Sequence, residues 1–89
     1  MRQEINEPIS VYFVSDPGRQ IKPLFLAWRG RSYRVDQVSH TFTVPGAKLS
    51  AGGRRHVYCL IGEGLYFEIW LDPLTMVFTL REMSDGVSD

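Results

Sequence analysis

Cysteine is almost absent from this chain, since Cys59 is the one cysteine among 89 residues. An intramolecular disulfide is therefore impossible, which excludes the disulfide-stapled class of small secreted domains. Long apolar runs are missing as well, because no segment approaches the roughly 20 residues that a membrane-spanning helix needs. Residues 1–8 are polar and charged and contain no apolar signal region. These absences favour a cytoplasmic protein with no membrane partner.

Residue groups with recognisable reaction chemistry are also lacking. His40, His56 and Cys59 do not show the closely spaced ligand pairs that are typical of zinc sites. A strand would send His56 and Cys59 to opposite faces, so Cys59 is better explained as a small buried residue. Glu68 and Asp72 would lie roughly 13 Å apart on one strand, which is too far for two carboxylates that act on one bond. We therefore expect no enzymatic activity, no catalytic residue, no metal and no cofactor.

The pattern that is present is that of β-strands. Apolar and polar residues alternate in short runs separated by turns that contain Gly or Pro, and no segment shows a helical period. This pattern predicts an all-β fold, an antiparallel meander of five or six strands that is strongly curved or closed into a small barrel. Residues 1–8 are expected to form an N-terminal lead-in, 9–83 a single β domain and 84–89 a flexible acidic tail. The expected strands are 9–14, 21–28, 31–44, 54–61, 65–71 and 76–82.

The third expected strand changes phase along its length. Tyr33 and Val35 occupy odd positions, whereas Val38 and the apolar residues after it occupy even positions. One uninterrupted strand cannot send both sets to the same face of a sheet. We predict a bulge or bend within about two residues of Asp36–Gln37. The segment Pro45–Gly53, which is rich in glycine, is expected to be the most mobile internal loop.

Net charge is zero for the whole chain but uneven along it. Residues 18–58 contain eight basic residues and a single acid, Asp36, so this segment carries +7. Residues 1–17 carry −2 and residues 59–89 carry −5. A basic middle segment with acidic flanks permits a nucleic-acid-binding surface. It equally permits a fold in which paired strands neutralise one another.

The most distinctive local motif is W-R-G-R-S-Y-R at residues 28–34, where three arginines interleave with two aromatic rings around an expected turn. Arginine pairs with phosphates and aromatic rings stack on bases, so this composition suits single-stranded nucleic acid. The alternative is that the arginines mark strand ends and the two rings are core anchors. A second basic pair follows at 54–55, and a straight hairpin would hold it more than roughly 30 Å from the first cluster. The candidate nucleic-acid-binding residues are Arg29, Arg31, Arg34, Tyr33, Arg54 and Arg55.

Several short motifs resemble, in order, a small bacterial domain family of unknown function. They are P-x-F-x-x-W-R-G-R-x-Y-x-V at 23–35, R-R-x-x-Y at 54–58, F-E-I-W at 67–70 and L-R at 80–81. Members of that family occur alone or as C-terminal pieces of proteins related to Y-family, error-prone DNA polymerases. Residues 38–42 depart from the family pattern, because they lack the tryptophan that often follows there. The resemblance implies a bacterial cytoplasmic accessory domain near DNA repair. It does not imply a polymerase activity in this chain, and the family has no assigned catalytic residues to transfer.

Together these observations favour a non-enzymatic binding module that associates with nucleic acid. The alternative is a protein–protein interaction or self-associating β domain that uses sheet edges and exposed aromatic rings. The candidate partners are thus a single-stranded nucleic acid, a protein or a second copy of the chain. The exposure of Trp28 and Trp70 separates these functions from an inert scaffold.

Overall fold

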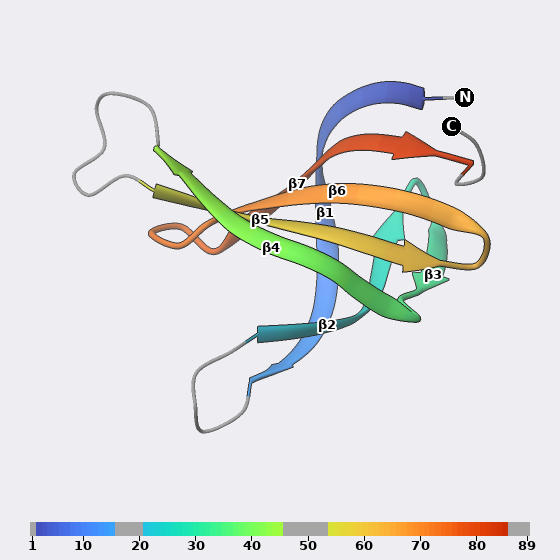
Figure 1. Ribbon diagram of the computed structural model, residues 1–89, viewed down its shortest axis with the longest axis horizontal. Helices are drawn as coiled ribbons and strands as arrows, with labels where there is room; N and C mark the ends of the chain where they lie inside the picture. Colours follow the sequence, from blue (N-terminus) through green and yellow to red (C-terminus); the bar gives the residue numbers. More distant parts are fainter. Residues whose placement is uncertain (1, 16–20, 46–53, 86–89) are drawn as a thin grey trace.

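β-Strands account for nearly all of the described structure. The computed structural model describes residues 2–15, 21–45 and 54–85, and it confirms the all-β prediction (Figure 1). Within these residues no helix is long and apolar enough to cross a membrane. The described strands are β1 (Arg2–Ser15), β2 (Ile21–Trp28), β3 (Arg31–Arg34), β4 (Gln37–Pro45), β5 (Arg54–Gly62), β6 (Leu65–Asp72) and β7 (Val77–Ser84).

The strands form one antiparallel sheet in the order β3-β2-β1-β7-β6-β5-β4. The long strand β1 joins two meanders, because its first half pairs with β7 and its second half pairs with β2. The two edge strands, β3 and β4, are consecutive in the sequence, and only Val35 and Asp36 separate them. A short connection between opposite edges requires the sheet to curl until those edges meet. The result is the half-barrel seen in Figure 1, with β3 and the start of β4 close together.

The link at Val35 and Asp36 is hydrogen-bonded to both halves of the curled sheet. The Val35 N–H donates to the Leu24 carbonyl of β2 at 2.9 Å, and the Asp36 N–H donates to the Ile61 carbonyl of β5 at 2.8 Å. These bonds satisfy backbone donors that would otherwise be free at the point where pairing changes partner. The link therefore closes one end of the half-barrel.

The turn between β5 and β6 packs directly against this link. The Glu63 carboxylate accepts a hydrogen bond from the Arg34 N–H at 2.8 Å, and the Glu63 N–H donates to the Asp36 carboxylate at 3.2 Å. At the adjacent Gly62, the Arg34 carbonyl oxygen occupies the place that a Cβ would take. Glycine is required there because two backbones approach closely, and not because of an unusual φ angle.

The inner face of the curled sheet holds the core. On β6 and β7, alternate side chains point inward, and the Phe67 ring meets the Tyr33 ring edge-on with centroids 5.4 Å apart. Burial of each large apolar side chain contributes about 1.5–3 kcal/mol to stability. The core cluster consists of Leu26, Tyr33, Tyr58, Leu60, Phe67, Ile69, Leu71, Phe78 and Leu80.

The structure confirms the predicted break in the third strand. β3 ends at Arg34 and β4 begins at Gln37, so the break falls at the predicted place. Splitting that strand also explains why there are seven described strands and not five or six. A second irregularity follows on β4, where the register with β5 shifts between Val38 and His40.

The expected boundaries at the two ends of the chain are wrong within the described residues. β1 begins at Arg2 and not at residue 9, so residues 2–8 are strand and not a lead-in. Most of these residues are polar, so the sequence lacks the apolar alternation that indicates a strand. The strand forms because its backbone hydrogen-bonds to β7. β7 likewise extends through Ser84, which was expected to open the tail. The predictions for the loop at 46–53 and the tail at 86–89 fall outside the described residues.

Candidate binding surfaces

The three arginines predicted to bind nucleic acid around the β2–β3 turn each contact a carboxylate. Arg29 pairs with Glu7 of β1 at 2.7 Å, and Arg34 pairs with Asp36 of the link at 2.8 Å. Arg31 lies 3.8 Å from Glu63 in the β5–β6 turn. Three positive charges thus meet three negative charges, and this surface carries no net charge. Glu7 and Glu63 come from outside the basic middle segment, so two of the three pairs neutralise it from other parts of the sheet, as the second interpretation of the charge pattern expected.

Two carboxylates of this cluster, Glu7 and Asp36, are held in their ionised form. Hydrogen bonds from Arg29 and then Trp28 lower the pKa of Glu7 below its ordinary value. The hydrogen bond from Arg34 and the backbone N–H of Glu63 lower the pKa of Asp36. Arg29 and Arg34 therefore keep their carboxylate partners throughout the neutral range.

The two aromatic rings of the motif at residues 28–34 pack in or against the core. Tyr33 is buried and belongs to the core cluster, with the Arg31 guanidinium 4.7 Å from its ring centroid. Trp28 is half-buried, its Nε1–H donates to Glu7 at 2.8 Å, and Arg29 lies over its ring at 4.7 Å. Neither ring offers a free face for a base, so the alternative interpretation of these two residues as core anchors fits their positions.

The second predicted arginine cluster lies far from the first. Arg54 begins β5, and its side chain lies outside the described part of the structure; Arg55 follows and faces Asp72 at 3.6 Å. Glu63, the partner of Arg31, follows the other end of the same strand. Seven residue steps from Arg55 to Gly62 span about 23 Å at the usual strand rise. The fold therefore does not bring the two clusters together.

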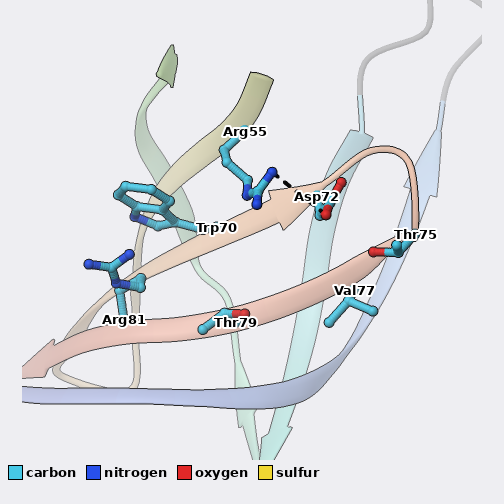
Figure 2. A pocket seen from close by; sticks show the side chains of 7 residues that line it. All are labelled: Arg55, Trp70, Asp72, Thr75, Val77, Thr79 and Arg81. Atoms are coloured by element: carbon cyan, nitrogen blue, oxygen red, sulfur yellow. Dashed lines mark ion pairs between the residues drawn. The ribbon is translucent and has the colours of Figure 1, made fainter. Parts of the chain in front are cut away.

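A hollow on the outer face of β5, β6 and β7 was not predicted from the sequence. It is open to solvent and has a volume of about 300 Å³ (Figure 2). Arg81 lines the hollow, and its guanidinium lies 4.2 Å from the centroid of the half-buried Trp70 ring. Trp70 in turn donates its Nε1–H to Glu68 at 2.7 Å. The lining residues are Arg55, Trp70, Asp72, Thr75, Val77, Thr79 and Arg81.

Arg81 differs from the arginines of the β2–β3 turn because no carboxylate pairs with it within the described structure. Its Nε atom is buried and has no hydrogen-bond partner. Such a site has no clear signal in the sequence. Trp70, Thr79 and Arg81 occupy outward positions in alternating strands, but their meeting depends on the register between β6 and β7.

An exposed apolar surface lies on the outer face of the β1–β2 hairpin, and we call it the β1–β2 patch. Val11 and Phe13 of β1 pack toward the core, so the alternate residues of that strand point outward. Tyr12 pairs directly with Phe25 of β2, and their side chains are 61% and 43% exposed. The patch consists of Tyr12, Val14, Leu24 and Phe25, all of which are exposed.

Within the described residues, no group of three His, Cys, Asp or Glu side chains is arranged to hold a metal ion. Cys59 is buried, as predicted. A scan of the chain against protein-family models finds no match, and searches of curated proteins and of solved structures find none either. The resemblance noted in the sequence therefore stays a prediction.

Proposed function

We propose that the protein is a non-enzymatic binding module that engages a protein segment through the β1–β2 patch. The observation that carries this proposal is the exposed cross-strand pair of Tyr12 and Phe25, extended by two aliphatic side chains. Contiguous exposed apolar surface is characteristic of interaction sites, and aromatic residues are enriched at interface cores. A resemblance to accessory domains of DNA polymerases supports the further proposal of a bacterial, cytoplasmic setting.

The charges around the patch indicate the chemistry of the partner. Lys22 lies opposite Val14, and no carboxylate pairs with it within the described residues. Arg34 lies opposite Phe25 at the other side of the patch, but Asp36 neutralises its charge. A symmetric contact between two copies would bring the Lys22 side chain of each copy into the same interface, because a twofold interface is made by the same surface on both subunits. We therefore propose a partner segment that combines apolar and acidic side chains.

A selection experiment with displayed random peptides tests this proposal. The wild-type protein should enrich peptides that combine aromatic or aliphatic residues with Asp or Glu. A Tyr12→Ser, Phe25→Ser double variant should lose those peptides, whereas the matched outer-face variant Ser10→Ala, Ser32→Ala should keep them. Enrichment that is the same on both double variants would contradict the proposal. Self-association that disappears in the Tyr12→Ser, Phe25→Ser variant would identify a second copy as the occupant.

Single-stranded nucleic acid is the second candidate ligand. The neutralised β2–β3 turn does not favour it, since phosphate binding depends on unpaired positive charge. The observation that does favour it is Arg81, which has no carboxylate partner within the described residues, lies over Trp70 and lines the same hollow as Arg55. The oligonucleotide arm of the experiment described below tests this candidate.

A further inference from the structure

The outer face of β5, β6 and β7 presents two arginines around one open hollow, whose lining includes no residue of the β1–β2 patch (Figure 2). We propose that this hollow binds the phosphate group of a nucleotide through Arg81 and Arg55. The proposal uses none of the residues of the β1–β2 patch, so the two proposals succeed or fail separately.

A β-bulge places Arg81 in the hollow. Glu68 of β6 pairs with Glu82 of β7, and the next residue, Ile69, pairs with Leu80. Arg81 is therefore the extra residue, which has no partner across the β6–β7 ladder. Bulges of this kind re-aim a side chain and occur often beside binding sites. Here the bulge coincides with the arginine that lies over Trp70.

The Trp70 ring orients the Arg81 guanidinium without neutralising it. A guanidinium that stacks on an aromatic ring keeps its full charge and its outward donors, whereas an ion pair would use both. The buried Nε of Arg81 has no hydrogen-bond acceptor, and no ion pair of the described structure uses this guanidinium. Its terminal nitrogens remain available for an anion.

The remaining lining residues favour phosphate on a planar body. Thr75 and Thr79 contribute hydroxyl donors, and the two guanidinium groups contribute N–H donors. The total number of these donors exceeds what the two oxygens of a carboxylate can accept. A volume of about 300 Å³ is larger than a bare oxyanion needs, and Trp70 and Val77 offer apolar surface beside the charged groups. A nucleoside ring that follows the phosphate would use that space.

Asp72 limits the affinity of the site in a way that can be tested. Its carboxylate lies 3.6 Å from Arg55 and also accepts the backbone N–H of Leu74 at 3.0 Å. With two arginines and one carboxylate, the lining carries a net charge of +1. An incoming phosphate competes with Asp72 for Arg55. Removal of the Asp72 charge should therefore strengthen phosphate binding.

An NMR titration of the full chain tests the proposal with adenosine monophosphate, adenosine, inorganic phosphate and an unphosphorylated single-stranded oligonucleotide. Adenosine monophosphate should saturate shifts of the Trp70 indole N–H and the Thr79 amide, and adenosine should not. If the oligonucleotide binds more tightly than adenosine monophosphate, the bound phosphate belongs to the phosphodiester backbone of a nucleic-acid strand. A stronger effect of the mononucleotide would identify a free nucleotide.

Three variants assign the binding to the hollow. Arg81→Gln should weaken the binding of adenosine monophosphate by about tenfold or more, as loss of a charge-assisted contact does. Asp72→Asn should strengthen it, and Arg34→Gln, which removes a positive charge elsewhere, should leave it unchanged. If Arg81→Gln does not fold, Arg55→Gln and Thr79→Val replace it with the same expectation.

The proposal is overturned if none of the phosphate-bearing probes shifts the Trp70 and Thr79 signals. It is also overturned if adenosine binds as tightly as adenosine monophosphate, or if Arg34→Gln weakens binding as much as Arg81→Gln. Inorganic phosphate that binds as tightly as adenosine monophosphate would overturn the assignment to a nucleotide.

Discussion

At the scale of single residues, three glycines in or beside turns have different reasons to be glycine. Gly30 and Gly64 have φ angles of 77° and 75°, and no atom lies near the position of an added Cβ. Gly62 does not need that conformation, but the Arg34 carbonyl fills the space beside its Cα. Backbone strain therefore disfavours other residues at positions 30 and 64, whereas contact between two segments excludes a side chain at Gly62.

This difference leads to a prediction about alanine substitutions. Gly62→Ala should destabilise the domain by about 2–3 kcal/mol or more, because the link or the β5–β6 turn must move to admit a methyl group. Gly64→Ala should cost only about 1–2 kcal/mol, which is the usual penalty for a left-handed conformation. Urea unfolding of both variants measures the difference. Equal losses would mean that the β3–β4 link does not pack against Gly62 in solution.

The arginines of this chain differ in whether a carboxylate pairs with them. Arg29, Arg31 and Arg34 belong to the most conspicuous basic motif, yet each has a carboxylate partner contributed by another segment or by the link. Arg81 stands in an acidic stretch of the sequence and has none within the described residues. Local charge in the sequence is therefore a poor guide to free charge on the surface, because partners come from distant strands.

At the scale of elements, the carboxylates of Asp36 and Glu63 hold the β3–β4 link against the β5–β6 turn through hydrogen bonds. Asp36 pairs with Arg34 and accepts the Glu63 N–H, and these bonds lower its pKa below the ordinary value of 3.8. A carboxyl whose folded-state pKa is depressed contributes stability that is fully present above its unfolded pKa. That contribution is lost as the pH falls through the lower pKa of the folded protein.

We therefore predict that stability falls as the pH drops below about 4, and that Asp36→Asn removes part of this fall. The variant should be less stable than wild type at neutral pH and should approach it in acid. Urea midpoints measured across the acid range check this expectation. An Asp36→Asn curve that runs parallel to the wild-type curve would assign the acid sensitivity to other carboxylates, with Glu7 the next to test.

At the scale of the whole molecule, the half-barrel depends on the two-residue link between its edges. β3 and β4 are separated by five strands in the sheet order, yet Val35 and Asp36 connect them. The link donates hydrogen bonds to β2 on one side and to β5 on the other. Closure at this end is thus a property of the complete sheet and of no single hairpin.

This arrangement predicts slow amide exchange at two residues that lie between strands. The N–H groups of Val35 and Asp36 should be protected about as well as ladder amides of β6, because opening either one requires the curled sheet to part. Hydrogen exchange followed by NMR measures this protection. Gly30 in the β2–β3 turn provides an exposed comparison. Rapid exchange at both Val35 and Asp36 would show that the edges separate readily.

Much of the strand pattern follows from the sequence alone, because alternation is a local property. The bounds predicted for β2 match the structure, and the phase change between Val35 and Val38 places the break between β3 and β4. Turn residues and apolar alternation need no knowledge of distant partners. The same information also predicts that Cys59 is buried.

Only the tertiary structure decides the strand pairing, the charge pairing and the candidate binding surfaces. The polar first half of β1 becomes a strand because β7 lies beside it, and Glu7 neutralises Arg29 because the sheet curls. The meeting of Arg81 with Trp70 depends on a register shift between β6 and β7. Each of these results comes from contacts between residues far apart in the chain, whose register depends on how the whole sheet closes.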